Sequence, residues 1–96
     1  MSAPDRTIWE VILMERGRQE RLRASGKFRF TIADTRISHE RRLTILLEEV
    51  GEVAKILNES DATGRPTYTL ELTSELVQVA ACAVGWLEAL GTMRDG

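Results

Sequence analysis

Two pairs of oxygen-bearing side chains have the types and the spacing to bind a divalent metal ion. Glu49 and Glu52 stand three residues apart, and Glu75 and Gln78 repeat that spacing further along the chain. Residues three apart lie on the same face of a helix. If two such helices face each other, the pairs supply several oxygen ligands of the kind that Mg²⁺ and Mn²⁺ prefer, and the remaining coordination positions stay open for water or phosphate. The pattern therefore predicts a magnesium or manganese site between two helices.

The first acid of each pair stands in the middle of an otherwise apolar helix face. A carboxylate in a buried apolar face is costly unless its charge is compensated, and a bound cation is the simplest compensation. The alternative is a structural ion pair, for which the chain has 13 Lys and Arg residues. With about 100° per residue, the apolar neighbours within about 40° are Ile45, Val53 and Ile56 around Glu49, and Val79, Cys82, Trp86 and Ala89 around Glu75.

Three helices are expected to position these residues. Pro4 and Asp5 suit a helix start and Gly26 suits a stop. Ser38 is a good N-cap for the second helix, and Gly91 with the polar tail should end the third. The expected ranges are 5–25, 38–59 and 69–90 for the helices, 26–37 for an extended connector whose phenylalanines pin it to the helices, and 60–67 for a loop.

This order of elements predicts an all-α fold in a single domain, residues 1–96. The short loop makes the second and third helices an antiparallel hairpin, with the N-terminal helix beside it. The apolar sectors of the hairpin are too wide for one short helix to cover. We therefore expect the chain to form a helical bundle on oligomerisation.

Composition favours a soluble, cytoplasmic protein. Hydrophobic residues make up 43% of the chain and charged residues 29%, and the net charge of −2 gives no basic footprint for nucleic acid. The lysines and arginines of residues 16–29 form a local cluster, for which a solvated helix face is a simpler interpretation than a phosphate contact. The single Cys82 argues for a reducing compartment. No signal peptide is visible, and the longest apolar run, residues 79–87, is about half of a membrane span, so no membrane partner is expected.

Residues 47–54, with the sequence LEEVGEVA, closely resemble the EExxE motif of the all-α, MazG-like nucleoside triphosphate pyrophosphohydrolases. The later ELVQ at residues 75–78 resembles the second motif of that family, ExxD, and the 22 residues between Glu52 and Glu75 fall in the family's range. The resemblance covers about residues 41–90. The ELVQVAA stretch resembles short variants of the family from actinobacterial and phage genomes.

The resemblance implies an enzyme that cleaves a nucleoside triphosphate to the monophosphate and pyrophosphate and that works as a homodimer or homotetramer. Carried over by position, Glu49, Glu52 and Glu75 would ligate Mg²⁺, for which Mn²⁺ could substitute. Glu48 would orient or activate the attacking water, or ligate a second metal. A metal that neutralises phosphate charge and a carboxylate that positions water both suit phosphoryl chemistry.

Two departures from the family pattern leave a second function open. Gln78 stands where the second motif has an aspartate, and its amide oxygen can coordinate a metal but brings no charge. The chain also stops after the third helix, where many relatives have a fourth. A catalytically weak or inactive helical module for binding or assembly is therefore the alternative to an enzyme.

The remaining residues of chemical interest are less specific. Large aromatic residues at helical spacing, Trp9 and Trp86 among them, are more often core than base-stacking platforms. His39 is expected at the surface and Cys82 as a small apolar filler. The candidates for substrate contact are Lys27, Arg29 and Arg36 on the connector, for the triphosphate, and Trp9, for the base.

Overall fold

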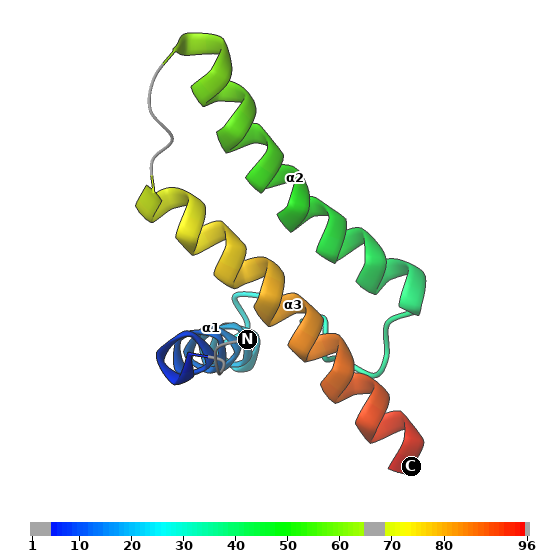
Figure 1. Cartoon of the computed structure of the whole chain (residues 1–96). Helices are drawn as coiled ribbons and strands as arrows, with labels where there is room; N and C mark the ends of the chain where they lie inside the picture. The colour runs from blue at the N-terminus through cyan, green and yellow to red at the C-terminus, as the bar shows by residue number, and fades with distance from the viewer. Residues whose placement is uncertain (1–4, 65–68, 96) are drawn as a thin grey trace.

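The computed structural model describes residues 5–64 and 69–95, which form three helices (Figure 1). The helices are α1 (Arg6–Ala24), α2 (His39–Thr63) and α3 (Thr69–Asp95). No strand occurs within those two stretches, and residues 26–37 connect α1 to α2 through turns. The prediction of an all-α fold is confirmed.

The helix starts follow from the capping residues that the sequence indicates. The Asp5 side chain accepts a hydrogen bond from the Thr7 backbone nitrogen at 2.8 Å, and Ser38 accepts one from the Arg41 nitrogen at 3.0 Å. Each bond satisfies one of the donors that the first turn of a helix leaves without an intrahelical partner. Gly26, with φ of 84°, follows the C-cap of α1 in the left-handed conformation that favours glycine.

Two predicted helix ends were wrong, and both helices are longer than expected. α2 continues through Thr63 and ends at Gly64, whose φ of 67° supplies the left-handed cap. Residues 60–63 of the expected loop are therefore helical, residue 64 is the cap, and the rest of the expected loop, residues 65–67, lies outside the described residues. α3 continues past Gly91, which does not take a positive φ and so does not cap the helix.

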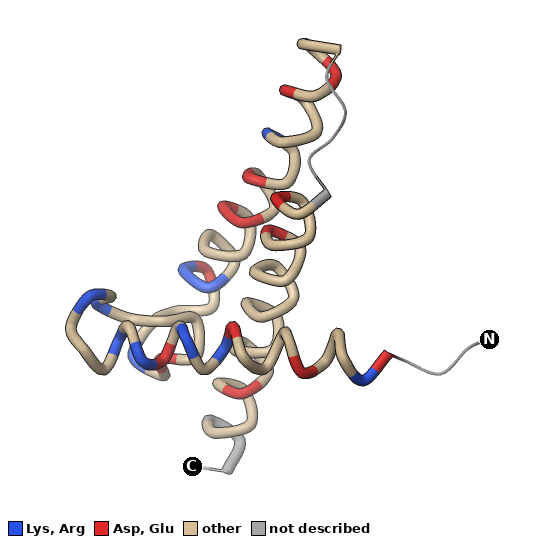
Figure 2. The backbone as a smooth tube through the Cα atoms, turned by 90° about the vertical axis from the view of Figure 1, so that its left-hand side faces the viewer, with Lys and Arg blue, Asp and Glu red and all other residues tan. Residues whose placement is uncertain are grey.

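The central helix is α3, which packs against both of the others. α2 runs beside it in the opposite direction, as the hairpin prediction required (Figure 1). α1 crosses α3, and the lysines and arginines gather on the second half of α1, on the connector and at the start of α2 (Figure 2). The buried apolar side chains of the described residues are few: Ile12, Ile32, Ile56, Ala81, Cys82 and Ala89.

Ile32 and Arg42 hold the connector, and of its two phenylalanines only Phe30 is partly buried, where it faces Arg41 of α2. Ile32 is buried and Phe28 is 40% exposed. The fully buried Arg42 guanidinium donates from Nε to the Ile32 carbonyl oxygen at 2.8 Å and from Nη2 to the Asp34 carbonyl oxygen at 2.6 Å. The start of α2 is thereby bonded to the segment that precedes it.

A glycine lets the connector and α1 approach α3 closely. A Cβ atom at Gly85 would lie 2.5 Å from Ile32 Cγ2 and 3.1 Å from Arg16 Nε. The small-residue run around positions 80–85 thus permits close packing within one chain, because contacts this short leave no room for a methyl group.

Residues Leu70–Thr92 of α3 are long enough and apolar enough to cross a membrane by length and composition, with a mean hydropathy of 1.2. Only 17% of this window is buried. The absence of a membrane partner and the cytoplasmic location therefore stay predictions from the sequence.

Candidate functional site

The two acids that stand on apolar faces, Glu49 of α2 and Glu75 of α3, lie next to each other between the helices. One carboxylate oxygen of Glu75, Oε2, is buried without any hydrogen-bond partner. Burial raises the pKa of the Glu49 carboxyl above its ordinary value, and the neighbouring carboxylates, Glu75 foremost, raise it further. Both effects disfavour the ionised form of Glu49, because a charge there would be incompletely solvated and close to other carboxylates.

No arginine or lysine within residues 5–64 and 70–92 forms an ion pair with Glu49 or Glu75. Arg18 of α1 comes close enough for its pKa to be raised, in small part, by Glu49. Its guanidinium, however, donates two hydrogen bonds of 2.8 Å to Glu15. The alternative of a structural ion pair is therefore not found in the described part of the chain.

A pocket of about 190 Å³ opens beside Glu49. Its walls come from all three helices and from the connector, which makes it the place where the elements of the fold converge. Carboxylate, amide and guanidinium groups occur among aromatic and aliphatic side chains. The lining residues are Glu15, Arg18, Gln19, Phe28, Phe30, Thr31, Ile32, Ile45, Glu49, Gln78 and Cys82.

The predicted metal ligands are brought together only in part. Glu49 and Gln78 line the pocket and Glu75 adjoins Glu49, whereas Glu52 is exposed on α2. Among the residues described, no three His, Cys, Asp or Glu side chains are grouped closely enough to hold a metal ion. The donor set that one chain offers is therefore a pair of carboxylates and a nearby amide.

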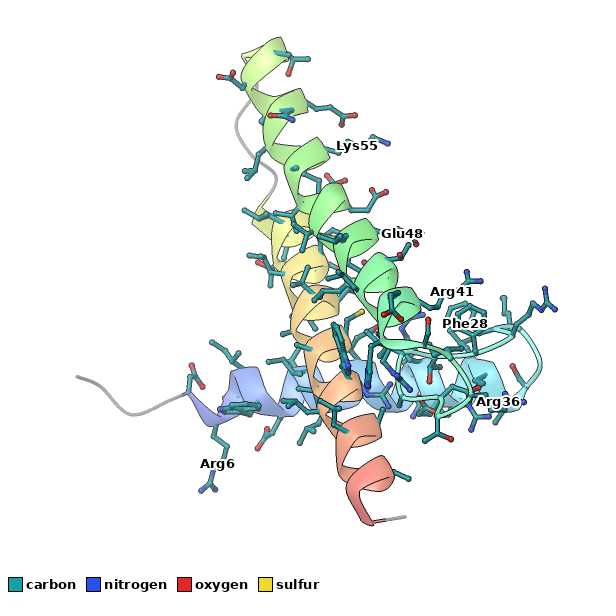
Figure 3. All side chains as sticks on the ribbon, turned by 90° about the vertical axis from the view of Figure 1, so that its right-hand side faces the viewer. Arg6, Phe28, Arg36, Arg41, Glu48 and Lys55 are labelled. Atoms are coloured by element: carbon teal, nitrogen blue, oxygen red, sulfur yellow. The ribbon has the colours of Figure 1, made fainter. Side chains whose placement is uncertain are left out.

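Glu48, the predicted catalytic residue, is exposed and does not line the pocket. It projects from α2 on the side of the connector, as Lys55 does (Figure 3). That Glu48 does not line the pocket follows from the helix geometry, since it lies about 100° from Glu49 around α2.

The predicted substrate contacts do not converge on the pocket. Lys27 and Arg29 are exposed on the connector. Arg36 forms an ion pair with Asp34, Nη2 to Oδ2 at 2.5 Å, and this contact lowers the pKa of Asp34 to about 2. Trp9 is 51% exposed on α1 and is not among the pocket residues, so the expectation that it belongs to the core was wrong.

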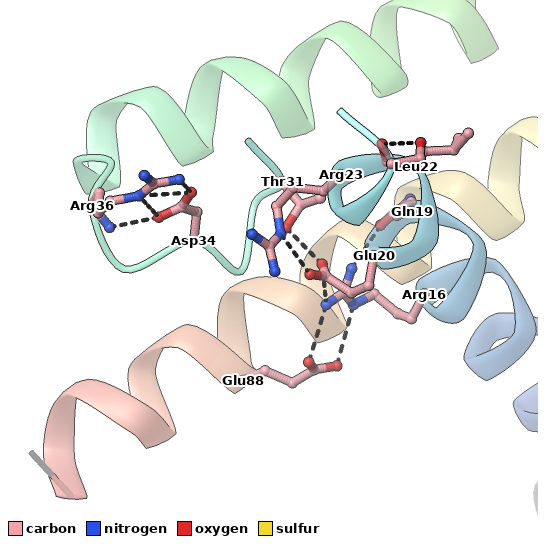
Figure 4. Close-up of polar contacts among 10 residues, drawn as sticks. Arg16, Gln19, Glu20, Leu22, Arg23, Thr31, Asp34, Arg36 and Glu88 are labelled. Carbon is pink, nitrogen blue, oxygen red and sulfur yellow. Dashed lines mark hydrogen bonds and ion pairs between the residues drawn. The ribbon is translucent and has the colours of Figure 1, made fainter. Parts of the chain in front are cut away.

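Sequence reasoning missed the buried arginine of α1. Arg16 donates to both carboxylate oxygens of Glu88 at 3.2 and 3.1 Å and pairs with Glu20 at 3.0 Å (Figure 4). Burial by itself lowers the pKa of this guanidinium, but the carboxylates of Glu88 and Glu20 more than offset it. Helical periodicity could have indicated that Arg16 is buried, because it stands one turn after the buried Ile12 on the same helix face.

The second buried arginine, Arg42, could have been found in the same way, because it lies two turns before Glu49 on that face of α2. It also contacts His39, Nη1 to Nδ1 at 3.2 Å. His39 is exposed, as expected, but its ring stacks on Trp86 and accepts a hydrogen bond from the indole Nε1 at 3.0 Å.

Cys82 is buried as the expected apolar filler, and burial raises the pKa of its thiol to about 11.

Comparisons with known proteins give no relative for this chain. No family model, no curated protein and no solved structure matches it.

The repulsion at Glu49 should be visible as a stability change. A carboxyl whose pKa is raised in the folded state contributes stability that is present at low pH and is lost as pH rises through the folded pKa. In EDTA at neutral pH, Glu49→Gln should therefore melt a few degrees above the wild type. The difference should disappear below the ordinary pKa of glutamate, where both side chains are neutral. Thermal melts from pH 3 to pH 8 test this, with the exposed Glu59→Gln as the control that should show no such pH-dependent gain; a Glu49→Gln protein less stable than wild type at neutral pH would contradict it.

Proposed function

We propose that this protein is a metal-dependent nucleoside triphosphate pyrophosphohydrolase, which releases pyrophosphate and a nucleoside monophosphate and so limits a non-standard or surplus nucleotide. The observation that carries the proposal is the half-buried Glu49–Glu75 pair. It has no cationic side-chain partner in the described residues, and one of its oxygens has no hydrogen-bond partner. A homodimer or homotetramer is part of the proposal.

The donor set suits Mg²⁺ better than a metal that needs a complete protein cage. Mg²⁺ is usually held by one or two carboxylates together with waters and substrate phosphates. Glu49 and Glu75 would be those carboxylates, and the Gln78 amide in the pocket wall would offer a neutral oxygen. When bound, the ion would neutralise charge on the phosphates. Mn²⁺ accepts the same oxygen donors.

The other groups of the pocket suit the remaining parts of a nucleotide. Phe28 and Phe30 present aromatic surface, and Gln19 presents an amide that can both donate and accept hydrogen bonds. Arg18 brings the positive charge that a phosphate would attract, once it exchanges Glu15 for the ligand. Glu48, exposed on α2, is the proposed carboxylate that orients water.

A non-catalytic binding or assembly module is the second candidate. It is favoured by the absence of a three-ligand group among the described residues and by the neutral Gln78. Such a module would bind a cation or nucleotide at the pair without hydrolysing it, so the two candidates differ in turnover and agree in binding.

The deciding experiment is a pyrophosphate-release screen of common and modified nucleoside triphosphates with Mg²⁺ or Mn²⁺. We expect turnover of at least one substrate, and a loss on the order of 100-fold or more in Glu49→Gln and Glu75→Gln, since these remove metal ligands. Millimolar Mg²⁺ should also raise the melting temperature of the wild type more than that of Glu49→Gln. Glu59→Gln, an exposed acid further along α2, is the matched control and should behave as the wild type.

The outcomes separate the two candidates. A metal-dependent rise in melting temperature without pyrophosphate release from any substrate would favour the binding module. Equal rises in the wild type and in Glu49→Gln, together with no turnover, would rule out both candidates at this site.

A further inference from the structure

The lysines and arginines are segregated along the chain. Residues 16–42 contain nine of the 13 lysines and arginines but three of the 15 aspartates and glutamates. That stretch has a net charge of +6 and the rest of the chain −8, an asymmetry that the overall net charge of −2 conceals. In the fold the stretch forms the second half of α1, the connector and the start of α2, where the positive side chains gather (Figure 2). The molecule therefore has a basic region that suits a polyanion.

Four of these nine cations have no carboxylate partner. Within residues 5–64 and 70–92, ion pairs use four others, and the buried Arg42 bonds carbonyl oxygens of the connector. The four that remain are exposed and form no ion pair with the residues described: Arg21, Lys27, Arg29 and Arg41. The basic region is thus not neutralised by its own carboxylates, and these charges are available to a ligand.

Three of the four cations stand next to aromatic side chains of the connector. Lys27 and Arg29 flank Phe28 in the sequence, and the Arg41 guanidinium lies over the Phe30 ring at 5.4 Å. Phe28 is 40% exposed, and both phenylalanines line the pocket of about 190 Å³. Figure 3 shows Phe28 and Arg41 on the same side of the molecule, at the connector. Cations interleaved with aromatic surface are typical of sites that bind single-stranded nucleic acid, because the cations bind phosphates while bases stack on the rings.

The polar lining of the pocket suits a base better than a phosphate. Without a metal ion, the carboxyl groups of Glu15 and Glu49 disfavour a second anion there. They can instead accept hydrogen bonds from the amino groups of a base, and the Gln19 amide can both donate and accept. A base in the pocket would leave its phosphate outside, where the exposed cations of the connector lie.

We propose that this surface binds single-stranded nucleic acid, with one base in the pocket against Phe28 and the neighbouring phosphates on Lys27, Arg29 and Arg41. A duplex fits less well, because its bases are stacked on one another and are not free to enter a pocket. An acidic peptide would satisfy the cations but would leave the aromatic surface unused. The inference goes beyond the proposed hydrolysis, since such binding needs neither a metal ion nor turnover.

The test measures the fluorescence anisotropy of labelled oligo-dT and oligo-U of about 12 nucleotides, a length within the site sizes of single-strand-binding domains. It is carried out in EDTA, so that failure of the metal site and failure of this surface are distinguishable. The wild type should bind, and raising the salt from about 50 to about 200 mM should weaken binding roughly 20-fold, as expected for about three phosphate contacts.

Two lysine variants with the same change of charge locate the phosphate contacts. Lys27→Gln should bind roughly 3- to 10-fold more weakly than the wild type and depend less steeply on salt, because one contact is lost. Lys55→Gln is the matched control. Lys55 is also exposed, but it lies about four turns along α2 from Arg41 (Figure 3), so this variant should bind as the wild type does.

A second pair of variants tests stacking. Phe28→Leu keeps the apolar bulk and removes the aromatic face, so it should weaken binding roughly 5- to 100-fold without changing the salt dependence. Trp9→Leu is the control, because Trp9 is 51% exposed and does not line this pocket. Circular dichroism checks that both variants fold, and the exposed Lys27→Gln decides the question if Phe28→Leu does not.

Four results would overturn the proposal. The first is the absence of saturable binding to either oligonucleotide, and the second is equal affinity for a duplex or for polyglutamate of the same length, which would reduce the surface to unspecific charge attraction. The third is a folded Phe28→Leu protein that binds as tightly as the wild type. The fourth is a nucleoside triphosphate that competes as well as the oligonucleotide, which would restrict the site to a single nucleotide.

Discussion

Arg42→Ala should destabilise the protein by about 3–5 kcal/mol, a large part of the roughly 5–14 kcal/mol expected for a chain of this length. The Arg42 side chain is fully buried, and its guanidinium bonds the carbonyl oxygens of Ile32 and Asp34. Alanine would leave both carbonyls without these donors and would open a cavity beneath the connector. Urea denaturation followed by circular dichroism measures the loss.

The adjacent Arg41 is the matched control. It is exposed, and its guanidinium lies over the Phe30 ring at 5.4 Å, so Arg41→Ala should cost no more than about 1 kcal/mol. Limited trypsin digestion gives a second readout. Because the connector is bonded to Arg42, cleavage after Lys27 and Arg29 should accelerate in Arg42→Ala and stay unchanged in Arg41→Ala. Similar losses of stability in the two variants would show that the buried bonds do not hold the connector.

Gly85→Ala should destabilise the protein by about 1–3 kcal/mol, although a glycine-to-alanine change within a helix ordinarily stabilises by about 1 kcal/mol. The sign reverses because the added methyl would lie 2.5 Å from Ile32 Cγ2 and 3.1 Å from Arg16 Nε. Thermal and urea denaturation measure the change. Gly91→Ala, in the same helix and with nothing within 4 Å of the new methyl, is the control and should stabilise.

A double-mutant cycle locates the cause. Ile32→Ala removes the methyl group that the new Cβ would strike, so Gly85→Ala should cost less in that background than in the wild type. A destabilisation that is the same in both backgrounds would place the strain elsewhere. If Gly85→Ala stabilised the protein as Gly91→Ala is expected to, the close approach of the connector to α3 would be refuted.

Helix starts and helix faces could be predicted from the sequence because both depend on neighbours within a few residues. Asp5 and Ser38 cap their helices through bonds to backbone nitrogens two and three residues away. The apolar face around Glu49 follows from helical periodicity alone, and the buried Ile56 confirms it. Helix ends were less predictable, since glycine can either cap a helix, as Gly64 does, or continue it, as Gly91 does.

The sequence by itself determined that the chain would be three helices with acids on two facing apolar stripes, because capping, periodicity and loop length act locally. Only the tertiary structure decided which charged groups meet. Arg16 reaches Glu88 from 72 residues away, whereas Glu49 and Glu75 meet each other with no arginine paired to either in the described residues. It also decided that Glu52 stays exposed and that Arg18, Phe28 and Phe30 join the pocket. These partnerships depend on how α1 crosses α3 and where the connector lies, which are set by contacts between residues distant in the chain, such as Ile32 against Gly85.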